Sequence, residues 1–178
     1  MLMAAGFCML EAGMVRTKSV ATICTKNIVL YSVAGILYFL VGYNLMYSGV
    51  DGGFIGTFSP FDVADPSVET SDSGYAGASD WFFQMVFVAT AASIVSGAVA
   101  ERVKLWSFLL IVVVLTAIIY PIQGSWTWGA GWLSNLGFSD FAGSTIVHSV
   151  GGWCALAGCI VLGSRKGKYS SDGRVNPM

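Results

Sequence analysis

Charged residues are scarce in this sequence. Only 11% of its 178 residues are charged and 55% are hydrophobic, whereas a soluble domain carries about 25% charged residues. Four stretches hold no charged residue at all: 27–50, 81–100, 105–139 and 141–164. Each is long enough for the roughly 20 apolar residues with which a helix crosses the hydrocarbon core of a bilayer. This scarcity excludes a soluble globular domain and predicts an all-α, polytopic membrane protein.

The sequence also lacks the residue sets that metal binding, nucleic-acid binding and catalysis need. It has one histidine, and its four cysteines, at positions 8, 24, 154 and 159, show no metal-ligand spacing. We expect these cysteines to be small buried hydrophobic residues. A net charge of −1 leaves no basic footprint for nucleic acid, and no nucleophile, base and orienting group occur together. We therefore expect no enzyme activity, no metal, no cofactor and no nucleic-acid partner.

The two ends of the chain are predicted to lie inside a longer protein. Residues 1–15 are apolar from the start, contain Glu11 and run into the basic segment Arg-Thr-Lys-Ser. A signal peptide would begin with a basic region and end in a small-residue cleavage site. Residues 1–15 therefore look like the second half of a transmembrane helix whose beginning is missing. The polar segment 164–178 ends abruptly after Asn-Pro, which suggests that further sequence follows.

The chain is predicted to form one domain with five membrane spans. The segment 50–80 is rich in Gly, Pro, Ser and Asp, a composition that cannot continue a helix. Pro121 is expected to end the fourth span, because proline has no N–H to donate within a helix. The predicted spans are 1–15 (partial), 27–49, 81–100, 105–122 and 141–163.

The positions of the basic residues orient these spans. All nine lysines and arginines fall within 16–26, 101–104 and 164–178, whereas 50–80 and 122–140 contain acidic residues and no basic ones. Cytoplasmic loops of membrane proteins carry an excess of Lys and Arg. We therefore expect a multi-pass protein of the cell membrane, with the three basic segments in the cytoplasm and the two acidic segments outside.

His148 is a polar residue within a long uncharged stretch. A helical rise of 1.5 Å per residue places it ~12 Å beyond Asp140, near the middle of a ~30 Å hydrocarbon core. A polar group at that depth costs free energy unless it has a partner or a wet cavity, so a functional role is the first hypothesis. The alternative is a neutral imidazole that is hydrogen-bonded to a neighbouring helix and serves only packing.

Asp140 also has two interpretations. An aspartate at the start of a span can cap the helix by accepting hydrogen bonds from its first N–H groups, where the helix dipole favours a negative charge. A carboxylate at this end would also favour a cation that arrives from outside. The two roles are compatible.

Aromatic residues near the outer face form a second group of candidates. Phe83 and Phe87 are four residues apart and therefore share one face of a helix. Three tryptophans follow in the outside turn, at positions 126, 128 and 132. Interfacial tryptophans usually anchor a protein in the membrane, but aromatic faces without a basic residue nearby are also suited to hold a small cation. Spacing does not choose between the two.

Four stretches of the sequence together resemble the ammonium transporter family, which comprises the Amt, Mep and Rhesus-type proteins. These are "GFCMLEAGMVRTKSV", "FFQMVFVATAASIVSGAVAER", "WTWGAGWLSNLGFSDFAGSTIVH" and "GSRKGKY". The resemblance spans essentially the whole chain and is strongest to the bacterial and plant branch. The strings Asp-Phe-Ala-Gly-x-Thr-x-Val-His and Gly-Ala-x-Ala-Glu-Arg are its specific parts. One departure is Ser144, where the family usually has a second glycine after Gly143.

The resemblance implies a fold, a function and roles for particular residues. The family fold has eleven helices built as an inverted repeat of five plus five, and it forms a homotrimer with one pore per subunit. This chain would be helices one to five. Trp128 and Phe83 would belong to an outer ammonium-recruiting vestibule, Phe87 to the phenylalanine gate, and Asp140 would support the recruitment site. His148 would be the first of two pore histidines, the second being on a later helix that this sequence lacks.

The implied function is transport of ammonium or ammonia through a hydrophobic pore in the lipid membrane. A PII-type regulatory protein docks on the cytoplasmic face in this family. Two alternatives stay open. One is an ammonium sensor, in which the same fold is followed by a signalling domain. The other is a Rhesus-type channel for ammonia or carbon dioxide, which Trp128 makes the less favoured of the two.

Overall fold

The computed structural model describes residues 2–62 and 74–176. Their regular elements are helices, and apart from one isolated bridge between Tyr169 and Val175 no strand pairing is assigned between described residues. The all-α prediction is therefore confirmed. The α-helices are α1 (Leu2–Gly13), α2 (Val20–Leu37), α3 (Tyr43–Tyr47), α4 (Gly77–Ala98), α5 (Leu105–Val114), α6 (Tyr120–Ser125), α7 (Trp132–Asn135) and α8 (Val150–Leu162). A short 3-10 turn, η1 (Thr17–Ser19), precedes α2, and three π-helical segments, η2 (Tyr38–Gly42), η3 (Leu115–Ile119) and η4 (Ser144–Ser149), join α-helices end to end.

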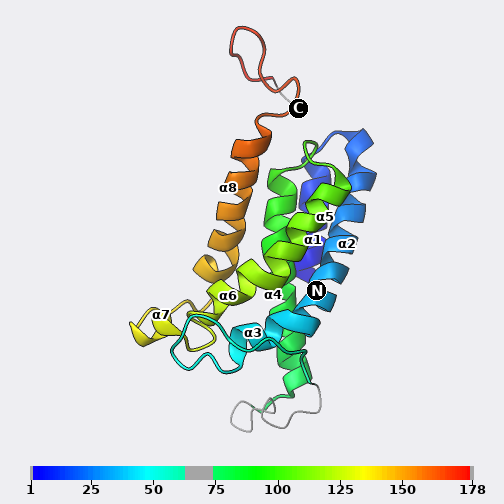
Figure 1. Cartoon of the computed structure of the whole chain (residues 1–178). Coiled ribbons are helices and arrows are strands. Elements are labelled where there is room, and N and C mark those ends of the chain that lie inside the picture. The colour runs from blue at the N-terminus through cyan, green and yellow to red at the C-terminus, as the bar shows by residue number, and fades with distance from the viewer. Residues whose placement is uncertain (1, 63–73, 177–178) are drawn as a thin grey trace.

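Joined in this way, the helices of the described residues make four apolar rods that are long enough to cross a membrane. They run over Thr17–Tyr47, Gly77–Ala98, Leu105–Ser125 and Ser144–Leu162. Figure 1 shows the rods aligned along one axis, with α1 as a shorter helix beside α2. This arrangement is that of a multi-pass membrane protein.

Helix α4 lies at the centre of the bundle and packs against α1, α2 and α8. Its small residues Ala89, Ala91 and Ala92 are almost completely buried, which lets neighbouring helices approach closely in lipid. One close approach is at Gly151, where an added Cβ would lie 3.0 Å from the Ala91 carbonyl oxygen. The α4–α8 contact therefore depends on small side chains.

The fourth span does not end at Pro121, and that prediction was wrong. The helix continues to Ser125, with Pro121 in the first turn of α6. Immediately before it, the Tyr120 N–H bonds to the Leu115 carbonyl, five residues back, in the wide π turn η3. The wider turn moves the helix past the proline without a break, since π bulges and prolines are both common sites where a helix adjusts its path.

Lys26 is not part of a solvated cytoplasmic loop, contrary to the assignment of 16–26. Helical structure begins at Thr17, and Lys26 is only 2% exposed. Its ammonium group donates to the Ser96 carbonyl at 3.1 Å and lies 4.3 Å from the centre of the Phe108 ring. Glu11, 4% exposed, accepts a 2.6 Å hydrogen bond from the Ser96 hydroxyl. Glu11, Lys26 and Ser96 thus form a buried polar cluster that joins α1, α2 and α4.

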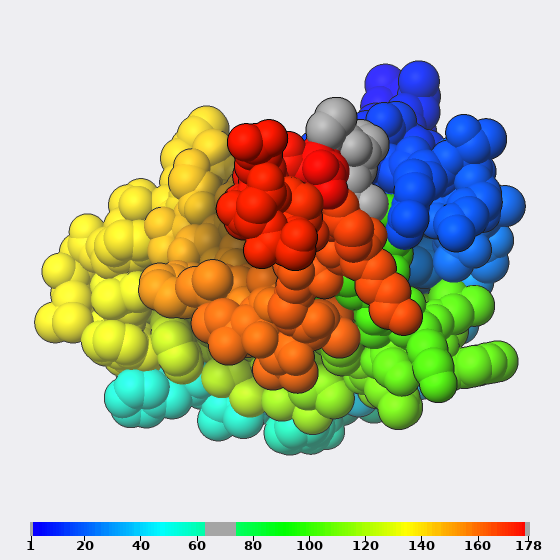
Figure 2. Space-filling model, turned by 90° about the horizontal axis from the view of Figure 1, so that it is seen from above, coloured from blue at the N-terminus to red at the C-terminus, as the bar shows by residue number. Residues whose placement is uncertain are grey.

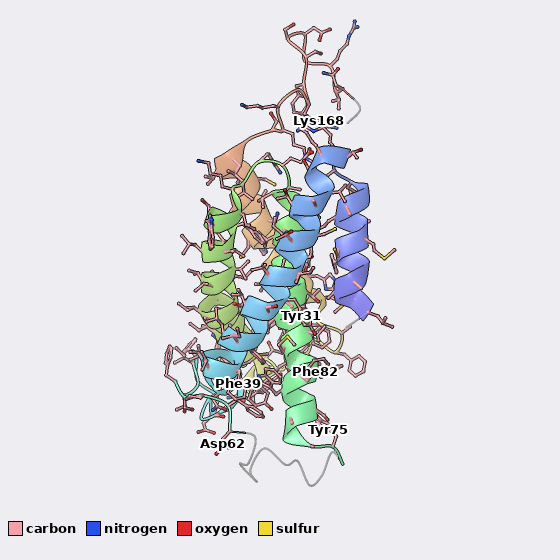
Figure 3. All side chains as sticks on the ribbon, turned by 90° about the vertical axis from the view of Figure 1, so that its right-hand side faces the viewer. Tyr31, Phe39, Asp62, Tyr75, Phe82 and Lys168 are labelled. Carbon is pink, nitrogen blue, oxygen red and sulfur yellow. The ribbon has the colours of Figure 1, made fainter. Side chains whose placement is uncertain are left out.

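The remaining charges divide between the two ends of the bundle. Figure 3 places Lys168 at one end and Asp62 and Tyr75 at the other. We call the first the basic end, because the turns after α1, α4 and α8 that meet there carry lysines and arginines, and the second the acidic end. Figure 2 looks onto the basic end, where the C-terminal segment, the end of α8 and the α4–α5 turn lie on one face. Of the predicted acidic segment 50–80, residues 63–73 lie outside the described residues.

Glu101 ties three segments of the basic end together. Its Oε1 atom accepts hydrogen bonds from the Arg16 backbone N–H at 3.1 Å, the Arg16 Nε at 3.0 Å and the Ser19 hydroxyl at 3.0 Å. Its Oε2 atom lies 3.6 Å from the Arg165 guanidinium. Burial alone would raise the pKa of Glu101, but the hydrogen bonds from Arg16 and Ser19 outweigh it and hold the pKa below its ordinary value.

We expect Glu101→Gln to lower the free energy of unfolding by about 1.5–3 kcal/mol at pH 7, the usual contribution of hydrogen bonds to a charged group. Because the pKa of Glu101 is lowered on folding, its stabilisation is present above roughly pH 4.3 and is lost as pH falls through the lowered pKa. Thermal unfolding of the full-length gene product in detergent, at pH 7 and at pH 3.5, measures this. The difference between the variant and wild type should be smaller at pH 3.5 than at pH 7. Asp172→Asn, on the exposed tail, is the matched control and should change nothing.

An aromatic pocket at the acidic end

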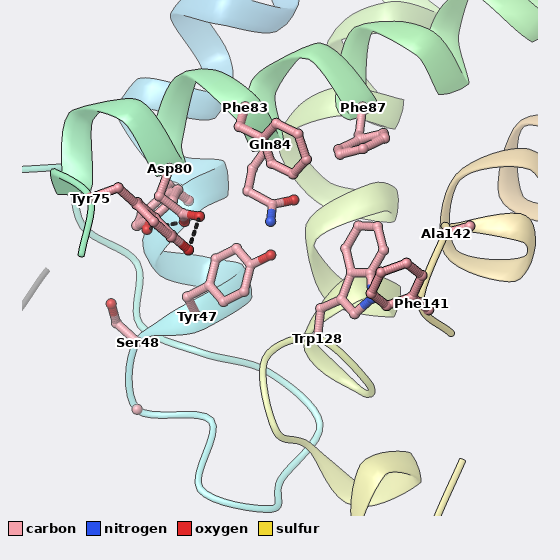
Figure 4. Close-up of a pocket in the computed structure, with 12 residues that line it drawn as sticks. Tyr47, Ser48, Tyr75, Asp80, Phe83, Gln84, Phe87, Trp128, Phe141 and Ala142 are labelled. Atoms are coloured by element: carbon pink, nitrogen blue, oxygen red, sulfur yellow. Dashed lines mark hydrogen bonds between the residues drawn. The ribbon is translucent and has the colours of Figure 1, made fainter. Parts of the chain in front are cut away.

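A pocket of about 950 Å³ opens at the acidic end, between the ends of α3 and α4, the α6–α7 loop and the turn before η4. Figure 4 shows its aromatic and polar side chains facing a common space. Its lining residues are Tyr43, Tyr47, Ser48, Gly49, Tyr75, Asp80, Phe83, Gln84, Phe87, Trp128, Phe141 and Ala142.

Three of the five predicted site residues line this pocket. The Phe83 and Phe87 rings meet edge to face at 4.9 Å, and the Phe87 and Trp128 rings lie 5.7 Å apart at 59°. Trp126 and Trp132 behave differently: they pack against each other at 5.8 Å and do not line the pocket. The structure therefore separates Trp128 from the other two tryptophans of the same turn, which spacing alone could not do.

The position of Trp128 is fixed by the turn that precedes η4. Its indole N–H donates to the Asp140 carbonyl oxygen at 2.6 Å. Gly143 has φ 82°, and an added Cβ there would lie 2.7 Å from a Val147 methyl and 3.2 Å from the Trp128 ring. A glycine is therefore needed both for the backbone angle and for the close approach of the indole.

The Asp140 carboxylate caps the last span. Its Oδ1 atom accepts from the N–H groups of Gly143 and Ser144 at 2.8 and 3.0 Å, and its Oδ2 atom from Thr145 and Ile146 at 2.8 and 2.9 Å. Partial burial would raise the pKa of Asp140, but these four donors outweigh it and hold the pKa below its usual value. The capping interpretation is confirmed. Asp140 does not line the pocket.

Asp140→Asn should destabilise the protein, because an amide can accept these bonds with only one of its two terminal atoms. We expect the free energy of unfolding to fall by about 2–3 kcal/mol at pH 7, measured by thermal unfolding of the full-length gene product. Since the pKa of Asp140 is lowered on folding, the wild-type advantage is present above about pH 4 and disappears as pH falls further. Asp51→Asn is the control, since Asp51 is exposed and its φ of 45° suits asparagine. An unchanged unfolding temperature in Asp140→Asn would contradict the capping role.

His148 lies on the π-helical segment η4, outside the aromatic pocket. Its backbone N–H bonds to the Gly143 carbonyl, five residues back, at 3.1 Å, and its ring Nδ1 is 3.4 Å from the same oxygen. The helix starts at Ser144, so His148 is roughly 6 Å along it. Its side chain is exposed in this chain, and in the described part no other helix offers its ring a hydrogen bond. A role as glue between these helices therefore has no support here.

The pocket also has a polar wall, which was not predicted from the sequence. Asp80 accepts hydrogen bonds from the Tyr43 hydroxyl at 2.7 Å and the Tyr75 hydroxyl at 3.2 Å. Gln84 and Tyr47 complete this wall. One signal was available, since Asp80 and Gln84 are four residues apart and share the helix face of Phe83 and Phe87. Within residues 2–62 and 74–176, no three His, Cys, Asp or Glu side chains gather where they could hold a metal.

Comparison with known proteins decides the family. The model of the Ammonium Transporter Family matches residues 1–177. The chain belongs to the ammonium transporter family. It is 45% identical over 183 residues to ammonium transporter Amt2 of Archaeoglobus fulgidus, covering 97% of this chain and 38% of that protein. It is 40% identical over 184 residues to ammonium transporter Amt2 of Haloferax mediterranei, again covering 98% of this chain and 38% of the relative.

Solved structures of family members have the same fold. A protein titled Sensor Amt Protein superposes with a TM-score of 0.89 at 40% identity, covering 98% of this chain and 44% of that one. Saccharomyces cerevisiae Mep2 superposes with a TM-score of 0.77 at 29% identity, covering 92% of this chain and 37% of that one. This ammonium transporter family chain thus spans about 40% of the length of these family members.

Proposed function

We propose that the protein carrying this sequence moves ammonium or ammonia across a membrane, and that the aromatic pocket is its entrance. The observation that carries the proposal is the meeting of Phe83, Phe87 and Trp128 in one pocket, in a family chain whose segments 50–80 and 122–140 contain no lysine or arginine. Aromatic faces attract a cation by about 0.5–2 kcal/mol, more as water is removed. A small, weakly hydrated cation such as ammonium suits such a pocket.

Each of the predicted site residues has its own role along the proposed path of ammonium. Trp128 and Phe83 hold the cation at the mouth, and Phe87 forms the apolar barrier below them. Hydrated sodium and potassium cannot pass such a barrier, whereas ammonium can release a proton and continue as neutral ammonia. His148 accepts and relays that proton, because an imidazole can both accept and donate hydrogen bonds. Asp140 holds the indole of Trp128 in place through its carbonyl.

The same proposal places the protein in the cell membrane as a homotrimer. The lysines and arginines of the basic end favour a cytoplasmic position for that end, so the aromatic pocket would open outside. A PII-type regulatory protein is the proposed partner at the basic end.

Transport is tested with the full-length gene product in liposomes. Ammonium pulses should produce a saturable current or uptake that sodium and potassium do not produce. Empty liposomes are the control. Absence of both current and ammonia flux in correctly assembled protein would overturn the transport function.

An ammonium sensor is the second candidate, because the Sensor Amt Protein structure superposes on this chain with a TM-score of 0.89. In a sensor, the same pocket would bind ammonium and pass the signal to a separate domain. The same liposome experiment separates the two functions: a sensor binds ammonium with little flux, and binding is then followed calorimetrically.

A further inference from the structure

We propose that Asp80 supplies the negative charge that draws ammonium into the aromatic pocket, a role that sequence reasoning gave to Asp140. This inference rests on the proposed function and adds a recruiting residue to it. The two carboxylates differ in the number of protein donors that bond to them: among the described residues, four bond to Asp140 and two to Asp80.

The Asp140 carboxylate is already fully engaged by the protein. A carboxylate offers about four lone-pair sites, and four backbone N–H groups occupy both oxygens of Asp140. The negative charge of Asp140 therefore interacts mainly with the dipole of the helix that it caps. Because its side chain also lies outside the pocket lining, Asp140 is a positioning residue that holds η4 and Trp128.

Asp80 has the opposite character. It lies in the first turn of α4, lines the pocket and is half-buried. Among the described residues, two hydroxyl groups bond to it, one on each oxygen, from Tyr43 and Tyr75, and Figure 4 shows this contact at the edge of the pocket. Roughly two lone-pair sites therefore remain for a ligand. No lysine or arginine occurs in 50–80 or 122–140 to neutralise it.

Two further oxygens point to a hydrogen-bond donor as the ligand. Gln84 Oε1 and the Tyr47 hydroxyl are both buried and make no hydrogen bond within the described structure. Both residues line the pocket, and Figure 4 shows them between Asp80 and Trp128. Buried polar atoms without a partner are rare, because each costs free energy unless a ligand or water satisfies it. An ammonium ion carries four N–H donors and would satisfy them.

Helix periodicity puts the acidic and aromatic parts on one face. Asp80, Phe83, Gln84 and Phe87 follow one another at intervals of three, one and three residues, so all four lie on the same side of α4. A cation attracted by Asp80 at the outer turn would thus pass Gln84 and reach the Phe83–Phe87 pair along a single helix face. The charge acts first, at long range, and the rings act after water is shed.

The test is Asp80→Asn in the full-length gene product, with ammonium current measured in liposomes. We expect the ammonium concentration at half-maximal current to rise about threefold to tenfold at low salt, with the maximal current within about twofold of wild type, because electrostatic steering acts on encounter. Added salt should weaken ammonium recruitment in the wild type but much less in the variant, since salt screens exposed charge. A purely structural role would not change this salt dependence.

Matched variants make the outcome unambiguous. Asp80→Glu keeps the charge and should stay close to wild type. Asp51→Asn removes one charge from the same end, outside the pocket, and should leave the half-maximal concentration unchanged. Should Asp80→Asn fail to assemble, Asp80→Ser carries the same expectation. Equal half-maximal concentrations in Asp80→Asn, Asp51→Asn and wild type, or equal rises in the two variants, would overturn this inference alone. Loss of all current in the wild type would instead overturn the proposed function.

Discussion

Ammonium current of the full-length protein should fall below about one tenth of wild type when His148 is replaced by alanine. A positioned general base typically contributes a factor of roughly 100 or more to a proton transfer, and a methyl group can neither accept nor pass on a proton. The variant should assemble normally, because the imidazole makes its one described hydrogen bond to Gly143 of its own turn. Current in liposomes and size-exclusion profiles measure the two expectations.

Thr145→Ala is the matched control for this experiment. Thr145 is exposed on the same π-helical segment, and its role in the cap is through its backbone N–H, which alanine keeps. Its current should equal that of wild type. Undiminished current in His148→Ala would refute the proton-relay role, whereas loss of assembly in that variant would show that His148 serves packing with sequence outside this chain.

The second large effect is expected at the buried polar cluster. Lys26→Met keeps the volume of the side chain but removes its charge, and it leaves Glu11 buried beside Ser96 without the neighbouring cation. Removing the charged donor of a buried hydrogen bond typically costs about 1.5–3 kcal/mol. We expect a loss of that size in the free energy of unfolding, measured by denaturant or thermal unfolding in detergent.

A double-mutant cycle tests whether Lys26 and Glu11 act together. Glu11→Gln in the Lys26→Met background removes the charge left without a counterpart, so the double variant should be more stable than Lys26→Met alone. The coupling free energy should lie within the range of about 0.5–3 kcal/mol found for residues in one network. Strictly additive effects would contradict an electrostatic connection through Ser96, and an unchanged stability of Lys26→Met would contradict the cluster's structural role.

Much of the fold follows from where charge is absent. Spans are visible in the sequence because hydrocarbon excludes charge over about 20 residues. The same reasoning fails where a charge has a partner inside the bundle: Lys26 was placed in a loop because Ser96 and Phe108, distant in sequence, cannot be seen beside it. Pro121 was misplaced for a similar reason, since a wide turn before it depends on packing and not on a local signal.

The candidate site was only partly predictable. Phe83 and Phe87 follow from helix periodicity, whereas Trp128 was picked out of three tryptophans by family resemblance alone. Asp80 was counted as one more outside charge, because the Tyr43 hydroxyl that orients it lies 37 residues earlier in the chain. A helix cap by Asp140 was predicted. That its carboxylate would bond to four backbone N–H groups and lie outside the pocket was not. Tertiary contacts decide which carboxylate lines the pocket.

The π-helical segments also set the angular phase of the helices they join. A π turn holds one residue more than an α turn, and one residue corresponds to about 100° of rotation. In the last span, η4 lies between the Asp140 cap at one end and the α8 surface that packs on α4 at the other. The added residue rotates α8 relative to the capped start of the span. The cap can therefore keep its hydrogen bonds to Asp140 while α8 keeps its packing face toward α4. With an ordinary α turn in its place, His148 would be rotated by about a quarter of a turn from the direction it now faces.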